Sequence, residues 1–317
     1  MISVIVITYN QKNYIKECLD SILLQDVCED IEVLVGDDCS TDGTTQIVLE
    51  YASLHPDVIK PIIRNNNIGA TANIVDLINR AKGRYVCFCE GDDYWISSSK
   101  LRLQSEFLDN YNMFSSVVHK TIIVDKDHKL IDSGNLNWIR HKRVYELKDF
   151  DALQLPGHIS SLFVKNSSLF KNSSISSMLC DRNSSDKEIF LLTLAIGKIG
   201  LIDEYLSAYR FLRNSDSGSL VASIYFSPIS RSVSEMQMLV AMEKWMSSEL
   251  SIKKYFIKAQ TKWLITAVFH KIKGFNVKLS DVWCLCNHKI LCLLYLPYML
   301  MVQLISKGRI VLKKDIR

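Results

Sequence analysis

The first hundred residues alternate between short apolar runs and segments in which apolar side chains recur at helical spacing. An apolar, β-branched run over residues 2–8 predicts a strand that is buried on both faces. Apolar positions three and four residues apart predict a helix over 15–23. The same alternation then predicts strands over 31–35, 58–63 and 85–89, and helices over 47–54 and 74–81. Pro61 places the third strand at an edge or end of the sheet, because proline lacks a backbone N–H.

This order of elements predicts an α/β fold with a mostly parallel central sheet and helices on both faces. From residue 227 onwards the spacing of apolar residues is helical. We therefore predict a sheet domain over 1–225 and a helical region over 226–317. The length of 317 residues allows such an arrangement, and 48% hydrophobic with 23% charged residues excludes a disordered or collagen-like protein.

The net charge and the cysteines limit the class of partner and the cellular compartment that the sequence favours. The 38 basic residues against 34 acidic ones give a net charge of +4, which is too small to favour nucleic acid as the main partner. The nine cysteines lie mostly within apolar runs, so we expect reduced core thiols in a reducing compartment. The chain opens on an apolar strand pattern and has no signal-peptide pattern, which leads us to expect a cytoplasmic protein.

Polar and acidic side chains follow the ends of three predicted strands. Because ligands of parallel α/β sheets bind at the carboxyl ends of the strands, we expect these side chains to face one crevice. Three close carboxylates need a compensating cation or proton, and their oxygens suit Mg²⁺ or Mn²⁺. A solvated acidic turn at 90–93 and a helix-capping loop at 37–44 are the structural alternatives. The residues are Thr8, Tyr9 and Asn10, then Asp37 and Asp38, then Glu90, Asp92 and Asp93.

The sequence lacks a glycine-rich phosphate loop after the first predicted strand. Neither GxxxxGK[ST] nor GxGxxG is present there, which argues against a P-loop NTPase and a dinucleotide-dependent dehydrogenase. A nucleotide would have to be held by its base, its ribose and a metal-bridged diphosphate. We therefore predict a nucleotide-diphosphate site with Mn²⁺ or Mg²⁺ as cofactor.

Several motifs follow one another in the first 105 residues. They are Thr8-Tyr9-Asn10 after the opening strand, Asp37-Asp38-x-Ser40-x-Asp42-x-Thr44, Asn67-x-Gly69, Ala81-x-Gly83 and Glu90-x-Asp92-Asp93. This ordered set resembles the family 2 glycosyltransferases, which are inverting enzymes with a GT-A fold. The run from Asp92 to Trp95, followed by Lys100, Leu101 and Gln104, resembles the branch that builds bacterial surface polysaccharides.

The resemblance implies a role for each matching position near the donor. Asp92 would lie at the ribose and diphosphate, and either Asp92 or Asp93 would bind the metal. Glu90 stands where the family's DxD-type motif has its first Asp, and Trp95 closes the same motif as a further candidate site residue. The other residues implied to bind the nucleotide are Thr8, Tyr9, Asn10, Asp38 and Asn67.

Later positions resemble the acceptor side of the family's site. His158 precedes Ser160-Ser161-Leu162-Phe163, and a structural histidine is its alternative. Asp186 resembles the catalytic base at a helix start; Asp181 competes for that role, and a helix N-cap is the structural alternative. Arg210 matches the family's next landmark, but the His expected about two residues later is absent. Arg213 is the candidate to neutralise the leaving diphosphate in its place.

The resemblance implies a metal-dependent inverting glycosyltransferase. It would move a sugar from a nucleotide-diphosphate sugar, with uridine the commonest base, to a saccharide or lipid-linked saccharide in O-antigen or capsule biosynthesis. Asp186 would take the acceptor proton while the metal stabilises the leaving diphosphate. A metal-dependent nucleotidyltransferase and a non-catalytic nucleotide- or sugar-binding scaffold stay open as other classes.

Residues 290–306 carry no charge and are flanked by Lys289, Lys307 and Arg309. This stretch of 17 residues, with Pro297 inside it, is marginal for a membrane span. A core helix is one interpretation. An interfacial helix whose flanking lysines meet anionic lipid is the other, and it would give the protein a peripheral contact with the inner face of the membrane.

Overall fold

The computed structural model describes residues 1–131, 142–149, 155–166, 186–212, 228–246, 250–273, 278–294 and 296–297. The chain divides into two compact units, Met1–Ala222 and Ser223–Arg317. The boundary predicted between residues 225 and 226 lies outside the described residues and stays a prediction. Asp181 and Arg213 also lie outside them.

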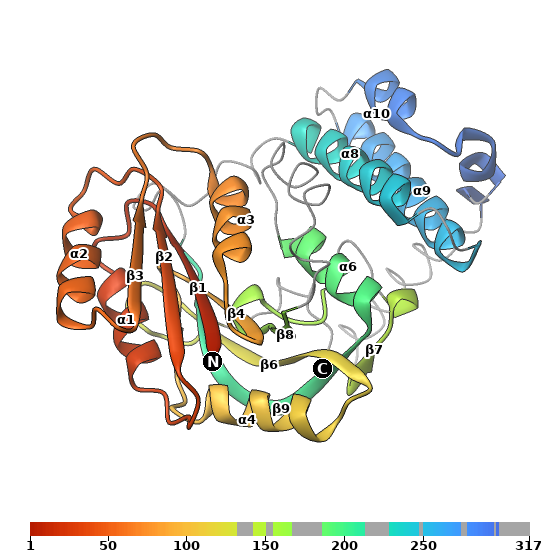
Figure 1. The fold of residues 1–317 in the computed structure, drawn as a ribbon. Coiled ribbons are helices and arrows are strands. Elements are labelled where there is room, and N and C mark those ends of the chain that lie inside the picture. Colours follow the sequence, from red (N-terminus) through yellow and green to blue (C-terminus); the bar gives the residue numbers. More distant parts are fainter. Residues whose placement is uncertain are drawn as a thin grey trace, which may run out of the picture. The chain divides into compact units, whose positions relative to one another are not determined.

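Four parallel strands and the helices that connect them build the N-terminal part of the first unit (Figure 1). The strand order is β3-β2-β1-β4, so β3, which contains Pro61, lies at the edge of the sheet as predicted. The elements are β1 (Ile2–Thr8), α1 (Ile15–Leu23), β2 (Ile31–Asp37), α2 (Thr44–Leu54), β3 (Ile59–Ile63), α3 (Ala70–Arg80) and β4 (Tyr85–Glu90).

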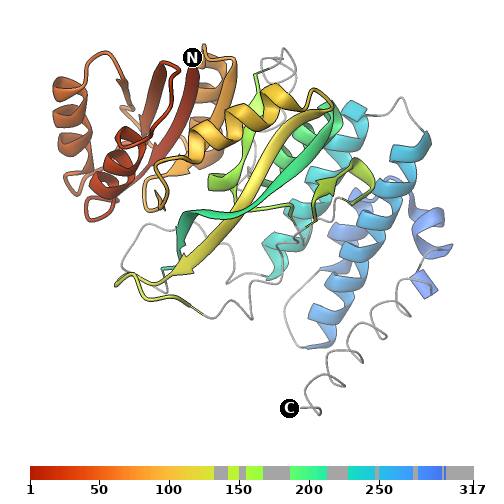
Figure 2. The same cartoon turned by 90° about the horizontal axis from the view of Figure 1, so that it is seen from below.

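Beyond β4 the sheet becomes mixed. β8 pairs antiparallel with both β4 and β6, while β6 and β9 run parallel as a long curved pair beside α4 (Figure 2). The far end of β9 pairs antiparallel with β5, and β7 also pairs with β9. The elements are β5 (Tyr94–Trp95), α4 (Lys100–Asn110), β6 (Phe114–Val124), β7 (Val144–Tyr145), η1 (Leu147–Asp149), η2 (Ile159–Ser161), β8 (Phe163–Lys165), α6 (Asp186–Ile196) and β9 (Lys198–Arg210).

The predicted fold class is confirmed. Helices α1 and α2 lie on one side of strands β1–β3, and α3 lies on the other (Figure 1). Val4 and Val6 of β1 pack in one core with Ile15 and Leu19 of α1, and all four are fully buried. Both faces of β1 are therefore covered, which explains its continuous apolar run and fixes the register that carries the polar residues at its end.

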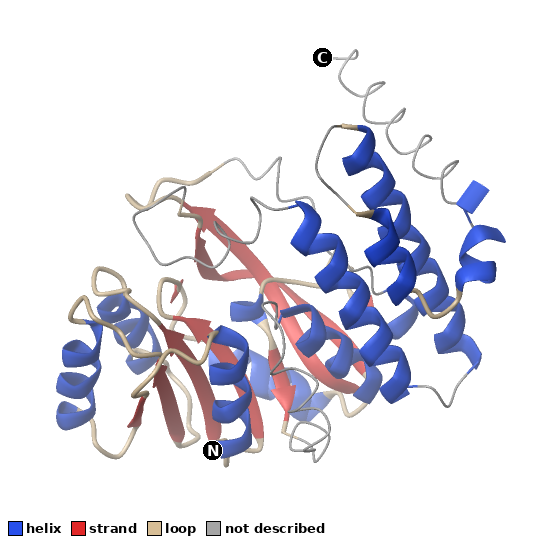
Figure 3. Cartoon of the chain, turned by 90° about the horizontal axis from the view of Figure 1, so that it is seen from above, coloured by secondary structure: helices blue, strands red, loops and turns tan. Residues whose placement is uncertain are grey.

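The described elements of the second unit are helices (Figure 3): α8 (Pro228–Met246), α9 (Leu250–Ile272) and α10 (Leu279–Leu285). The helical pattern predicted for this region is confirmed. Buried Glu243 of α8 accepts a hydrogen bond from Gln260 of α9 over 2.9 Å, and Met236, Leu239 and Trp263 are buried. Within the described residues, no helix has the length and apolar character needed to span a bilayer.

Candidate active site

The carboxyl ends of β1 and β4 lie side by side, because their register pairs Ile7 with Glu90. The amide of Gly91 donates to the Ile7 carbonyl over 2.9 Å. A Cβ at position 91 would lie 2.9 Å from Thr8 Cβ and 2.4 Å from Gln11 Oε1, so glycine is needed for this close approach. The acidic loop 90–93 therefore turns directly against the end of β1, as the parallel strand order predicts.

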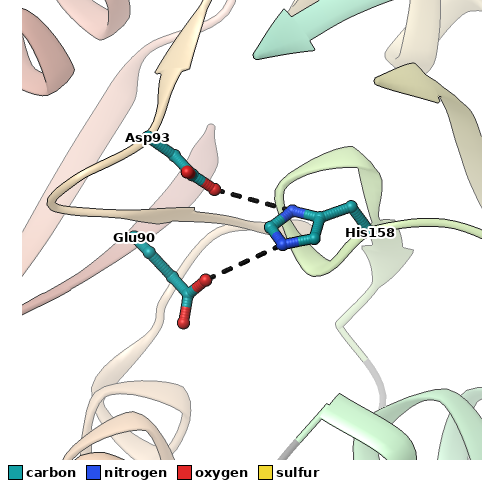
Figure 4. Close-up of side chains that lie close together, drawn as sticks. All are labelled: Glu90, Asp93 and His158. Atoms are coloured by element: carbon teal, nitrogen blue, oxygen red, sulfur yellow. Dashed lines mark ion pairs between the residues drawn. The ribbon is translucent and has the colours of Figure 1, made fainter. Parts of the chain in front are cut away.

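Glu90, Asp93 and His158 point toward one another at the centre of the site (Figure 4). His158 Nδ1 lies 3.5 Å from Asp93 Oδ2, and His158 Nε2 lies 3.9 Å from Glu90 Oε2. The side chains of Asp93 and His158 are buried, whereas that of Glu90 is 33% exposed. The sequence suggested separate acidic and acceptor-side segments, and the structure brings His158 against the acidic loop.

His158 is a neutral imidazole in this setting. Burial lowers its pKa to about 3. Its Nδ1 accepts a hydrogen bond from the Ser160 amide over 3.3 Å, which assigns the ring proton to Nε2, on the side of Glu90. The ring also lies against Tyr209, with 4.3 Å between centroids. The orientation of the imidazole is thus fixed by the backbone of η2 and by β9.

The acidic loop concentrates negative charge in a site of low solvent access. Burial, followed by the charges of Asp186 and Asp92, raises the pKa of Glu90 well above its ordinary value. Burial, then Asp92 and Glu90, does the same to the pKa of Asp93. Burial raises the pKa of Asp92 to about 6, although the Arg210 guanidinium and Gln11 favour its charged form. The loop is therefore short of positive charge.

Arg210 fastens the acidic loop to two other elements. Its backbone amide donates to Asp93 Oδ1 and its Nε donates to the Asp92 carbonyl, each over 2.9 Å. Its guanidinium also pairs with Glu17 of α1 over 2.5 Å and lies over the rings of Tyr14 and Tyr94. Sequence reasoning missed Glu17, which there resembles any acidic residue in a helix's first turn.

These residues fit a divalent cation. In the described part of the chain, Glu90, Asp93 and His158 are the one group of three potential ligands, with ligand atoms within 4.8 Å of one another. Asp93 Oδ2 is buried and has no hydrogen-bond partner. Carboxylate oxygens are ligands that Mn²⁺ accepts, and a cation would relieve the repulsion that raises the pKa values of the carboxyls. His158 would join them only by freeing the lone pair of one ring nitrogen, because its Nδ1 accepts from the Ser160 amide.

The residues expected to bind the nucleotide base hold the loop after β3. Asp38 accepts hydrogen bonds from the amides of Ile68 and Gly69, each over 2.8 Å, and is 3% exposed. Asn67 is exposed, and its Oδ1 accepts from the Gly69 amide over 3.1 Å. Direct contact of Asp38 or Asn67 with a base stays a prediction.

The three residues at the end of β1 differ in exposure and in hydrogen bonding. Thr8 is 3% exposed, and its buried hydroxyl has no hydrogen-bond partner. Tyr9 is half-buried. Asn10 adopts a left-handed conformation with φ of 54°, and its Oδ1 accepts from the Thr41 amide over 2.8 Å. Asn10 thus joins this end of β1 to the loop after β2.

The candidates Asp186 and Trp95 differ in exposure. Asp186 is the first residue of α6 and is partly exposed, and its charge contributes to the raised pKa of Glu90, so it lies within electrostatic reach of the acidic loop. Trp95 is 4% exposed and packs in the hydrophobic core. The structure therefore does not bring the Trp95 side chain to the accessible part of the site.

The model of glycosyl transferase family 2 matches residues 3–172, more than half of the chain. An uncharacterized protein of Mycobacterium tuberculosis is 40% identical over 125 residues. That match spans 39% of this chain and 36% of the relative, so the chain matches well under two thirds of the relative's length.

Two solved structures share the fold. Staphylococcus aureus TarS, residues 1–349 with UDP-GlcNAc, superimposes with a TM-score of 0.63 at 21% identity, covering 92% of this chain and 81% of that TarS fragment. By sequence, TarS, a poly(ribitol-phosphate) β-N-acetylglucosaminyltransferase, is 38% identical over 112 residues, 35% of this chain and 19% of TarS. Mannosyltransferase PcManGT of Pyrobaculum calidifontis, with GDP-Man and Mn²⁺, gives a TM-score of 0.51 at 20% identity, covering 95% and 83%.

Proposed function

This chain belongs to glycosyl transferase family 2, and from that premise we propose that it transfers a sugar from a nucleotide-diphosphate sugar to a saccharide hydroxyl. The observation that carries the proposal is the convergence of Glu90, Asp93 and His158 beside Thr8, at the carboxyl ends of β4 and β1. An anionic diphosphate needs a cation to approach such a group, and these residues fit one.

The donor side of the reaction would use the acidic loop. Asp92, partly exposed, would face the ribose and diphosphate, and Asp92 and Asp93 would hold Mn²⁺ or Mg²⁺ with Glu90 and His158 in reach. The ion, when bound, supplies Lewis-acid stabilisation of the charge on the departing diphosphate. Arg210 keeps Asp92 and Asp93 in place through its two hydrogen bonds to the loop.

The acceptor side would use Asp186. An acceptor oxygen attacks the anomeric carbon, the bond from that carbon to the diphosphate oxygen breaks, and its electron pair stays on the diphosphate. The acceptor proton passes to Asp186, at the accessible N-terminus of α6. Attack from the side opposite the leaving group inverts the anomeric configuration.

The donor nucleotide is the property to measure first. The structure of TarS holds UDP-GlcNAc and that of PcManGT holds GDP-Man, which supports a nucleotide sugar and leaves uridine as our proposal. UDP, GDP and dTDP are titrated calorimetrically into the protein with Mn²⁺ and again with EDTA. We expect UDP binding that needs the metal and is lost in Asp92→Asn.

The matched control is Asp57→Asn, which changes an exposed aspartate away from the acidic loop. Absence of binding for every nucleotide with Mn²⁺ present would overturn the proposed site. Product analysis then separates the enzyme classes, because a glycosyltransferase releases a nucleoside diphosphate whereas a nucleotidyltransferase releases pyrophosphate.

The acceptor we propose is a saccharide of a bacterial surface polymer, in lipid-linked or free form. The name of TarS describes transfer to poly(ribitol phosphate), which supports this class; an O-antigen or capsule is our proposed context. We further propose that the enzyme acts in the cytoplasm, where nucleotide sugars and reduced thiols occur together. The cysteines of the described residues are all free.

We also propose a peripheral contact with anionic membrane. Ile290, Leu291, Leu293 and Leu294 are 40–76% exposed and directly follow Lys289, a pattern that suits the interface of an acidic bilayer. Co-sedimentation with phosphatidylglycerol vesicles should fall in Ile290→Ser/Leu294→Ser. It should persist in Leu24→Ser/Leu54→Ser, which changes two equally exposed leucines of the first unit. Equal loss in both would contradict this contact.

A further inference from the structure

Lys100 is a buried cation that the reaction outlined above does not use. It is fully buried, and it is the first residue of α4. Both features cost stability, because burial removes the hydration of an ammonium group and a helix N-terminus repels positive charge. Burial accordingly lowers the pKa of Lys100 to about 8. An apolar residue would fill this position at lower free energy, so the lysine is expected to serve something other than folding.

The ammonium group of Lys100 has two specific contacts. It donates to Gln104 Oε1 over 2.8 Å, one turn further along α4. It also lies over the ring of Trp95, 4.0 Å from the centroid. Trp95 follows Asp93 by two residues, so this cation–π contact reaches the segment that carries the acidic loop.

Gln104 links Lys100 to η2, the short helix that follows His158. Its Nε2 donates to the Ser161 carbonyl over 2.8 Å, and both residues are fully buried. Ser161 in turn donates to the His158 carbonyl, from its amide over 2.9 Å and from its hydroxyl over 2.6 Å. Helix α4 thus holds η2, and η2 holds His158.

We propose that Lys100 and Gln104 are positioning residues that set the distance between the acidic loop and His158. Lys100 holds the loop through Trp95, and Gln104 holds η2 through Ser161. Because Gln104 uses its oxygen for Lys100 and its nitrogen for Ser161, a movement of η2 breaks a buried hydrogen bond, and a movement of the loop breaks the cation–π contact between Trp95 and Lys100. This inference rests on the proposed function, since it assigns the pair to the arrangement of that same site.

The test compares Lys100→Met, Gln104→Met and the double variant. Lys100→Met leaves the Gln104 oxygen unpaired, and Gln104→Met leaves the Lys100 ammonium and the Ser161 carbonyl unpaired. The double change leaves only the Ser161 carbonyl unpaired and also removes the buried charge. We therefore expect the double variant to lose less thermal stability than Gln104→Met. We expect the kcat of the double variant to fall about tenfold or more, because small displacements of reacting groups are costly, while Kd for Mn²⁺-dependent UDP stays within about threefold.

The matched control is Ser105→Ala, on the same helix. Ser105 is buried, but its hydroxyl donates within α4 to the Arg102 carbonyl, so its loss should leave kcat unchanged. Wild-type kcat in the double variant would overturn the positioning role. A loss of kcat accompanied by a matching loss of thermal stability would also overturn it, because folding alone would then explain the effect.

A second readout does not depend on turnover. Nitrogen-15 spectra of the histidine rings should show His158 as the Nε2–H tautomer in the wild type, and a shifted or broadened signal in the double variant. An unchanged His158 signal would overturn the proposal. Failure of the wild type to bind any nucleotide would instead refute the proposed function, so the two failures are distinguishable.

Discussion

The backbone amide of Arg210 donates a hydrogen bond to Asp93 Oδ1 over 2.9 Å, across 117 positions of sequence. The same residue's guanidinium pairs with Glu17, so the end of β9, the acidic loop and α1 meet at one side chain. Arg210 is 2% exposed, and its charge is shared between Glu17 and the loop. We therefore propose that Arg210 serves to hold the acidic loop in shape.

Replacing Arg210 tests this arrangement. Arg210→Met keeps the backbone bond to Asp93, but it removes the guanidinium from Glu17, which then has His128 as its ion-pair partner, and it removes the charge that favours ionised Asp92. We expect Mn²⁺-dependent UDP binding near pH 6 to weaken about tenfold, measured by calorimetry. Arg84→Met is the control, because Arg84 also pairs with carboxylates, Glu29 and Asp109, on the exposed surface. Equal weakening in both variants would contradict a specific role.

The two sides of the proposed reaction can be separated by substitution. Asp186→Asn should lower kcat by about a hundredfold or more, because it removes the base that takes the acceptor proton. Binding of UDP with Mn²⁺ should remain, since Asp186 lies outside the acidic loop. Steady-state rates and calorimetry on the same preparation measure both properties. Full transfer activity in Asp186→Asn would exclude it as the base.

Lys100 predicts a dependence of stability on pH. Its pKa is about 8 in the folded chain and 10.5 ordinarily, so the unfolded state binds more protons between these two values. The free energy of unfolding should therefore rise with pH across that window, by at most about 3 kcal/mol. The neighbouring thiol of Cys87 has its pKa raised to about 12, above the window.

Denaturant unfolding at several pH values measures this effect. The rise in unfolding free energy from pH about 8 to about 10.5 should be present in the wild type and reduced in Lys100→Met. Near pH 7, where the buried charge is most costly, the stability of Lys100→Met should compare more favourably with that of the wild type than it does above pH about 10.5, where the lysine is neutral. The same pH slope in both proteins would show that another group is responsible.

The close packing around Gly91 predicts that a larger residue at this position would displace the acidic loop. Gly91→Ala would place a Cβ 2.4 Å from Gln11 Oε1 and 2.9 Å from Thr8, so the acidic loop must move away from β1. We expect a loss of about 1–3 kcal/mol in unfolding free energy and weaker nucleotide binding. Gly197→Ala, whose nearest contact would be Ser115 at 3.0 Å, should cost less and leave nucleotide binding intact.

The N-terminal strands and helices could be predicted because their signals are local. The apolar run of β1 and the spacing of Ile15 and Leu19 each lie within a few residues, and Pro61 marked the edge strand for a local reason. The parallel order then predicted that Thr8 and Glu90 end at the same edge of the sheet, which their register bears out.

The roles of single residues in the site depended on contacts that no local pattern contains. Glu17 and Arg210 are 193 positions apart, and Gln104 and Ser161 are 57 apart. Asp38 resembles a base-binding residue in the sequence, and that role stays a prediction; the structure adds that its carboxylate accepts from the amides of Ile68 and Gly69. A carboxylate can cap a loop or face a ligand equally well, and only its neighbours in space decide which.

The sequence by itself determined the first four strands, their parallel direction and the edge at which the polar residues gather, because the periodicity that predicts each element lies within a few neighbouring residues. The mixed half of the sheet beyond β4 had no such local signal. The tertiary structure alone decided that His158 faces Glu90 and Asp93, and that Trp95 and Lys100 pack inward. The physical reason is that the burial of a side chain, and the charges around it, depend on all the residues that lie near it in the folded structure. Segments distant in sequence come together in that structure, and their side chains acquire their pKa values and partners only there.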